Sequence, residues 1–193
     1  GGNQKLKKKY NSKVVGFKDD KDRIPEIDIL VENNQIWKKE NFEAKIYHIP
    51  GHTTGHIAFH FYKEKKIFTG DTLFSLGCGR LFEGTYEQMF NSLNKIKSLP
   101  GDTKIYCGHE YTKNNFKFCI KFNPNNDYLK VKEKTLEAKI KDGKPTIPST
   151  IKEEIQTNIF LRYSDADVKD ALNLKNASDL EIFTKLRDLK DNF

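Results

Sequence analysis

The amino-acid sequence predicts an α/β domain followed by an all-helical domain. Up to residue 111, short runs rich in Ile, Val, Phe and Tyr alternate with tight polar loops, which is typical of strands. One strongly periodic helix interrupts these runs, and beyond residue 111 apolar residues recur mainly at helical spacing. We therefore divide the chain into an α/β domain at residues 1–111 and a helical domain at residues 112–193.

The strands of the first domain are predicted from apolar runs bounded by turn residues. A charged stretch, Lys63-Glu64-Lys65-Lys66, separates two of the runs and is typical of a hairpin turn. Each run is followed by a polar loop, so we expect functional side chains in the loops that follow strands. The predicted strands are residues 13–17, 44–49, 57–62, 66–69 and 104–107.

The helices are predicted from capping motifs and apolar spacing. Residues 85–88, Thr-Tyr-Glu-Gln, have the form of a capping box, and apolar residues recur from Met89 to Leu99 at helical spacing. A second capping box follows the proline-containing linker at residues 144–149. The helices expected in the second domain surround Phe116 and Cys119 or span residues 128–140, 164–172 and 178–189.

Composition narrows the classes of function and location. The formal net charge is +7, but the 34 basic residues are mixed along the chain with 27 acidic ones and no nucleic-acid motif accompanies them. No run approaches the roughly 18 apolar residues of a membrane-spanning helix. The three cysteines form no C-x-x-C pair, which favours a reducing environment. We expect no nucleic-acid or membrane binding and a cytoplasmic location, with an organelle-targeting extension left open.

Three short motifs place candidate metal ligands after strand-like runs. His52 lies in Gly-His-Thr-Thr-Gly-His, Asp71 in Phe-Thr-Gly-Asp-Thr-Leu-Phe, and His109 in Tyr-Cys-Gly-His-Glu-Tyr. Imidazole and carboxylate groups are common zinc ligands, and the two oxygens of a carboxylate can bridge two cations. These motifs indicate a metal-dependent hydrolase with His52, Asp71 and His109 as metal ligands and Asp71 as the catalytic carboxylate.

The other histidines have competing interpretations. His52 and His56 are four residues apart, as in a helical zinc-binding pair, but the glycines around them favour a loop. In such a loop one histidine points at the site and the other orients it. His48 and His60 lie in strand-like stretches, where ordinary structural roles are expected.

Taken together, the motifs resemble the metallo-β-lactamase superfamily and, within it, the glyoxalase II enzymes, which are hydroxyacylglutathione hydrolases. The resemblance implies an αββα sandwich followed by a C-terminal helical domain. It covers essentially the whole chain. It is carried by GHTTGH at residues 51–56, FTGDTLF at 68–74, GCGRLFEGT at 77–85, YCGHEYT at 106–112, KPTIPST at 144–150 and LRDLK at 186–190.

The resemblance implies a cofactor and a reaction. Two divalent metal ions, zinc foremost with iron or manganese also found, would be held by His52 on one side and His109 on the other, with Asp71 between them. A metal-bridged hydroxide would attack the thioester of an S-(2-hydroxyacyl)glutathione such as S-D-lactoylglutathione. The products would be a 2-hydroxy acid and glutathione.

The resemblance also implies a glutathione-binding site. Arg80 corresponds to a basic residue near the glycine carboxylate of glutathione, and Tyr111 to a tyrosine that donates to the tripeptide backbone. Arg187 and Lys190 correspond to a basic pair on the last helix, where their spacing suits a carboxylate. Phe82 stands where many members have tyrosine, so one phenol donor to glutathione is lost.

One family signature does not occur in this sequence. A Thr-His-x-His-x-Asp-His loop supplies most of the metal ligands in the family and precedes Gly-Gly-Asn, the residues with which this chain opens. The resemblance thus implies an N-terminally truncated sandwich with an incomplete metal site. We expect weak metal binding, weak or absent hydrolysis by this polypeptide, and self-association through the bared sheet.

Two alternatives of other kinds remain at this point. A glutathione persulfide dioxygenase of the same superfamily shares the metal-ligand motifs and differs in consuming oxygen. A non-catalytic glutathione-binding module would bind glutathione without responding to added zinc. A basic nucleic-acid binder is a remote third interpretation, testable by salt-dependent binding to oligonucleotides.

Overall fold

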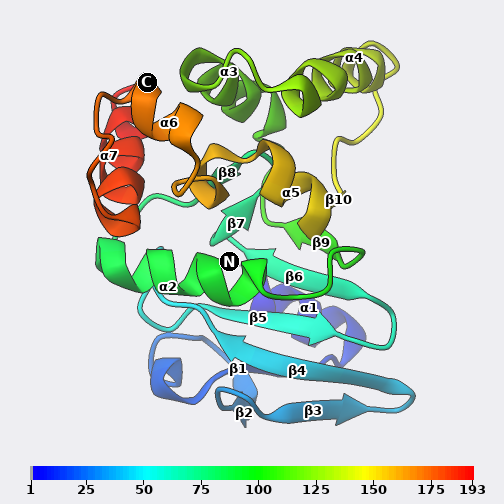
Figure 1. The fold of residues 1–193 in the computed structure, drawn as a ribbon. Coiled ribbons are helices and arrows are strands. Elements are labelled where there is room, and N and C mark those ends of the chain that lie inside the picture. Colours follow the sequence, from blue (N-terminus) through cyan, green and yellow to red (C-terminus); the bar gives the residue numbers. More distant parts are fainter. Residues whose placement is uncertain (1) are drawn as a thin grey trace.

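The structure is a computed structural model that describes residues 2–193. Strands form a six-stranded sheet and two smaller sheets, and helices surround them (Figure 1). The strands are β1 (Val14–Phe17), β2 (Ile27–Val31), β3 (Ile36–Lys39), β4 (Phe42–His48), β5 (Ile57–Phe61), β6 (Lys66–Gly70), β7 (Leu73–Phe74), β8 (Gly77–Cys78), β9 (Lys104–Cys107) and β10 (Ser149–Thr150). The helices are α1 (Asn3–Tyr10), α2 (Tyr86–Lys97), α3 (Thr112–Phe122), α4 (Asp127–Lys141), α5 (Ile151–Thr157), α6 (Ala166–Ala171) and α7 (Asp179–Asp191), with 3-10 turns η1 (Lys18–Asp20) and η2 (Ile159–Leu161).

The large sheet has the order β10-β9-β6-β5-β4-β3. β4 pairs antiparallel with β5, β5 pairs antiparallel with β6, and β6 pairs parallel with β9. β4, β6 and β9 therefore run in one direction and end at the same edge of the sheet. This shared edge brings together the loops that follow the three strands.

The α2 helix covers one face of this sheet, along the direction of the strands (Figure 1). Thr85 caps it, accepting from the Gln88 N–H, while the Gln88 side chain accepts from the Thr85 N–H, as the capping box predicted. Met89, Leu93 and Ile96 are fully or almost fully buried on the inner face of the helix. They share one apolar core with Ala58, Ile67 and Ile105 of the sheet.

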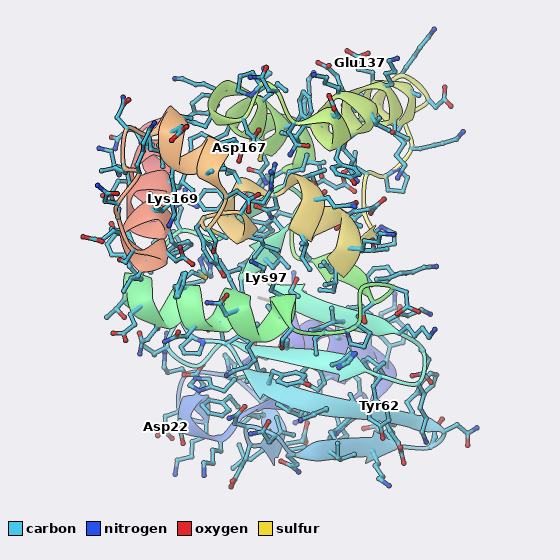
Figure 2. The ribbon with its side chains drawn as sticks, viewed as in Figure 1. Asp22, Tyr62, Lys97, Glu137, Asp167 and Lys169 are labelled. Atoms are coloured by element: carbon cyan, nitrogen blue, oxygen red, sulfur yellow. The ribbon has the colours of Figure 1, made fainter. Side chains whose placement is uncertain are left out.

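The helices from α3 to α7 stack beyond the β9 and β10 end of the sheet (Figure 1). The core extends into them through the buried rings of Phe118, Phe160 and Phe183. Lys97 of α2 joins the two regions, because its Nζ donates to the Leu161 carbonyl at 2.6 Å (Figure 2). The helical region is thus continuous with the core of the sheet.

The opposite face of the large sheet carries an aromatic groove. Phe59 and Phe68 are directly paired, so they share the face opposite to that of Ile67, which packs in the core. The groove has a volume of about 380 Å³. Its lining residues, called here the aromatic groove, are Trp37, Phe42, Phe61 and Phe68 with Lys39, Glu40, Glu64 and Lys66.

The predicted fold class is confirmed by this mixed sheet with its helical C-terminal region. One detail differs: β10, within the segment predicted as all-helical, pairs antiparallel with β9 and adds an edge strand to the sheet. α1, β2 and β3 were not predicted from the sequence. Among the residues that the structure describes, α1 has no buried side chain, so it lacks the apolar spacing that marks a helix.

No helix formed by residues 2–193 combines the length and the apolar character needed to cross a membrane.

Candidate active site

The three predicted metal ligands lie together at the shared edge of the large sheet. His52 is in the loop after β4, Asp71 directly follows β6, and His109 follows β9. Since these three strands run in one direction, their following loops emerge side by side. The topology explains why residues far apart in the sequence reach one place.

Asp71 stands between the two histidines. Its Oδ2 lies 3.6 Å from His52 Nε2, and its Oδ1 lies 3.4 Å from His109 Nε2. Asp71 Oδ1 is buried and has no hydrogen-bond partner among residues 2–193. A buried carboxylate oxygen without a donor is costly, unless a cation or another donor satisfies it.

Neighbouring contacts orient the nitrogen and oxygen atoms of the site. His52 Nδ1 lies 2.8 Å from the Arg80 carbonyl and donates to it, which leaves the Nε2 lone pair directed at Asp71. His56 Nε2 accepts the Asp71 backbone N–H at 2.9 Å. Burial lowers the pKa of His56, so it stays neutral and able to accept this bond. His56 thus orients the site, as expected for one of the two histidines of the loop.

Two glycines allow the close approach of backbone to these groups. A Cβ on Gly108 would lie 2.5 Å from Asp71 Oδ1, inside van der Waals contact. Gly70 has φ +51°, and a Cβ there would lie 2.4 Å from His56 Nε2. Side chains at either position would push the carboxylate or its orienting histidine aside.

The donor set fits part of a two-cation site. Imidazole nitrogen and carboxylate oxygen are suitable ligands, and each Asp71 oxygen faces a different histidine. Within residues 2–193, however, no three His, Cys, Asp or Glu side chains gather so as to hold one metal ion. The residues present would supply each of two cations with one histidine and one oxygen of the shared carboxylate.

A cavity of about 410 Å³ opens beside these ligands. All eight site residues predicted from the sequence line it, whereas His48 and His60 do not. His48 stacks on Phe17 and donates to the Thr54 carbonyl, and His60 is buried in the sheet. The lining is His52, Asp71, Phe74, Cys78, Arg80, Phe82, His109, Tyr111, Asn114, Asn115, Arg187, Lys190 and Asp191.

The cationic side of the cavity is organised by Asp191. Its Oδ1 lies 3.2 Å from Arg80 Nε and 2.9 Å from Arg187 Nη2. Arg80 is largely exposed, whereas Arg187 is only 2% exposed and donates from Nη1 to the Cys78 carbonyl at 2.8 Å. Burial lowers the pKa of Lys190, whose Nζ donates to the Asn114 carbonyl at 3.3 Å. The charged groups of Arg80 and Lys190 are therefore more available to a ligand in the cavity than that of Arg187.

Aromatic rings cover the two histidines predicted as metal ligands on the cavity side. The Phe82 ring lies 4.9 Å from that of His52, and the Tyr111 ring stacks on His109 at 4.8 Å. Phe74 contacts Tyr111 edge to face. Phe82 is 69% exposed, so its ring is accessible to a ligand in the cavity.

Several residues that line the cavity were not predicted from the sequence. Asp191 could have been found, because it stands four residues after Arg187 on the same helix face. Phe74 belongs to the motif of Asp71 but was given no role, and no sequence signal distinguished Asn114 or Asn115, which reach the cavity through the packing of α3 against the hairpin formed by β7 and β8.

Known proteins are similar to this chain along its whole length. A family model described as hydroxyacylglutathione hydrolase C-terminus matches residues 110–193, and one described as the metallo-β-lactamase superfamily matches residues 1–109. Proteins named hydroxyacylglutathione hydrolase are similar along the whole chain: that of Pelagibacter ubique is 62% identical and that of Methylococcus capsulatus 41%, with 75% of each relative covered.

Solved structures show the same fold at low sequence identity. ETHE1 from Myxococcus xanthus is 19% identical with a TM-score of 0.61, over 97% of this chain and 68% of that one. The BLEG-1 B3 metallo-β-lactamase is 21% identical with a TM-score of 0.59, over 83% of this chain and 70% of that one.

Proposed function

The chain belongs to the hydroxyacylglutathione hydrolase family of the metallo-β-lactamase superfamily, and on this basis we propose that it hydrolyses S-(2-hydroxyacyl)glutathione thioesters. The superfamily implies divalent metal ions. Two ions, with zinc foremost, form part of the proposal. So does a cytoplasmic location, which the three free cysteines support.

One observation carries the proposal: Asp71 presents each of its oxygens to a different histidine beside a cavity with a cationic rim. His52, Asp71 and His109 would hold the cations, with Asp71 as the bridge. When bound, the cations supply an acidified water as nucleophile and stabilise charge on the carbonyl oxygen. Glutathione leaves as a thiolate, and thiol pKa values near 8.5 make that group depart readily without a general acid.

The cavity residues would bind the glutathione moiety. Arg80 and Lys190 are suited to its carboxylates, and the Tyr111 hydroxyl to its peptide groups. Arg187 would support the site without binding glutathione directly, because its guanidinium already donates to the Cys78 carbonyl and to Asp191. Phe82 and Tyr111 would hold the thioester against the ligands and reduce the access of bulk water.

The test is hydrolysis of S-D-lactoylglutathione, followed by release of thiol. With excess Zn²⁺ we expect slow hydrolysis that a chelator abolishes, because zinc sites usually have about three or four protein ligands and residues 2–193 offer fewer for each ion. Two tightly held ions per purified chain would contradict the expected weak retention. Glutathione binding that ignores zinc, without any hydrolysis, would instead identify a binding module.

Replacing Phe82 with tyrosine is expected to strengthen glutathione binding. The ring lies beside His52 at the cavity mouth, and a hydroxyl there would add one donor to the ligand. A net gain of about 0.5–1.5 kcal/mol corresponds to a dissociation constant lower by roughly two- to tenfold. Calorimetry with glutathione measures it, with Phe68→Tyr in the aromatic groove as the matched control. Equal glutathione affinities for the two variants would show that Phe82 does not contact bound glutathione.

The aromatic groove is expected to mediate self-association of this polypeptide. Four aromatic residues form its floor, and its rim carries two lysines and two glutamates, Lys39, Lys66, Glu40 and Glu64. Such an arrangement is self-complementary, because a second copy related by a twofold axis can set lysines against glutamates.

Sedimentation should therefore show dimers that Phe68→Glu dissociates, since the substitution places a charge on the groove floor. The exposed ring of Tyr128 provides the control, because Tyr128→Glu adds the same charge on α4, which lies at the opposite end of the molecule from β3 (Figure 1). A monomeric wild-type chain would contradict this prediction.

A further inference from the structure

Glu83 connects three segments around the loop that carries His52. Its Oε2 accepts from the Thr54 N–H at 2.9 Å, from the Thr54 hydroxyl at 3.0 Å and from Arg23 Nη1 at 3.1 Å. Its Oε1 accepts from Arg23 Nη2. Arg23 Nη1 also reaches Asp20 Oδ1 at 3.2 Å. The carboxylate thus joins the segment after β1, the loop after β4 and the segment before α2.

The backbone beside Glu83 is tied to the same loop. The Phe82 N–H donates to the His52 carbonyl at 3.2 Å, and the Gly84 N–H to the Gly51 carbonyl at 3.1 Å. A Cβ on Gly84 would lie 2.6 Å from Gly51 Cα, so the two segments are in direct backbone contact. The residues on both sides of Glu83 are therefore hydrogen-bonded to the backbone of the loop that carries His52.

We propose that Glu83, clamped by Arg23, is a positioning residue that holds residues 51–55 so that His52 keeps Nδ1 on the Arg80 carbonyl and Nε2 toward Asp71. The segment of residues 80–84 supplies both ends of this arrangement, the Arg80 carbonyl and the Glu83 carboxylate. The clamp therefore fixes the position of the loop relative to the Arg80 carbonyl, which accepts from His52. The assignment of His52 as a metal ligand rests on the proposed function, but the positioning of its ring does not.

The number and kind of the bonds separate this clamp from an ordinary surface ion pair. Exposed pairs contribute little, because both side chains lose freedom and solvent screens their charges. Glu83 instead accepts a backbone N–H of the loop itself, in addition to the guanidinium fork. Arg23 and the Thr54 N–H lower the pKa of Glu83 to about 2, so its carboxylate is ionised throughout the neutral range.

The test reads the His52 ring directly, by nitrogen NMR of its imidazole in the full chain without metal. Wild type should show a single form protonated on Nδ1. Glu83→Ala should convert this signal to a mixture of both tautomers, because the Thr54 N–H loses its acceptor and the loop loses its link to the Arg23 guanidinium. Glu83→Gln keeps one oxygen for the Thr54 N–H and should give an intermediate result.

Glu43 provides a matched control far from the site. It also accepts from several donors, Lys38, Lys63 and the Tyr62 hydroxyl, and its pKa is likewise lowered to about 2. Glu43→Ala should leave the His52 signals as in wild type. A Zn²⁺ titration followed on the same signals should show about tenfold weaker binding for Glu83→Ala than for Glu43→Ala.

The outcomes discriminate between the hypotheses. If Glu83→Ala leaves the His52 tautomer unchanged, or if Glu43→Ala alters it equally, the positioning role is wrong. Should Glu83→Ala fail to fold, wild-type signals in Glu83→Gln with both tautomer and zinc affinity intact would overturn the role. If the tautomer changes but Zn²⁺ never perturbs His52, the clamp stands and the metal assignment fails.

Discussion

Replacing Asp71 with asparagine should abolish zinc binding at the site and lower thioester hydrolysis by roughly a thousandfold, the equivalent of about 4 kcal/mol of lost transition-state stabilisation. The amide has one oxygen and no charge, so it cannot present an oxygen toward each histidine as the carboxylate does. The measurement is zinc affinity by calorimetry, together with the rate of thiol release under excess Zn²⁺.

The same substitution should leave the free energy of unfolding of the metal-free chain unchanged or slightly higher. Asparagine preserves the shape and the backbone N–H bond to His56, and it replaces a buried carboxylate oxygen that has no donor within residues 2–193. A loss of function without a loss of stability is expected of a site residue. Asp102→Asn, at an exposed ion pair with Lys65, is the control for the removal of a carboxylate. If Asp71→Asn binds zinc as wild type does, the bridging role is wrong.

Replacing Arg187 with methionine should lower the free energy of unfolding by about 3 kcal/mol. The guanidinium is buried and donates to the Cys78 carbonyl and to Asp191, and it lies 5.2 Å from the centre of the Phe160 ring. Methionine fills much of the space, but it removes the Arg187 donor from the Cys78 carbonyl and leaves Asp191 paired with Arg80 alone. Urea denaturation measures the change, with the slope of the transition checked for constancy.

Lys190→Met on the same helix is the matched control for this prediction. Lys190 makes one long hydrogen bond, to the Asn114 carbonyl, so its replacement should cost less than about 1 kcal/mol of stability. It should instead weaken glutathione binding, because its ammonium lines the cavity. Equal losses of stability in both variants would show that Arg187 has no special structural role.

Local signals predicted much of the fold. The apolar runs at residues 57–62 and 104–107 correspond to β5 and β9, and the capping motifs at Thr85 and Thr150 begin α2 and α5 as expected. These features depend on neighbours within a few residues. β7 and β8 were not predicted, since two-residue strands are too short to show an alternating pattern.

The sequence predicted which residues form the candidate site better than it predicted how they contact one another. Three short motifs singled out His52, Asp71 and His109, and the order and direction of β4, β6 and β9 explain their meeting at one edge. Resemblance also assigned Arg187 and Lys190 to the same task. Their contacts differ, because burial of Arg187 against Phe160 and the Cys78 carbonyl depends on how α7 packs, which no local pattern records.

By itself, the sequence determined the fold class and the family, and it predicted the metal ligands, because short motifs and local periodicity carry this information. Tertiary structure alone decided which oxygen of Asp71 faces which histidine, that Asp191 joins Arg80 to Arg187, and that Glu83 holds the loop of His52. Each of these contacts joins segments that are distant in sequence. Their geometry follows from strand order and from helix packing, which arise only when the whole chain buries its apolar surface.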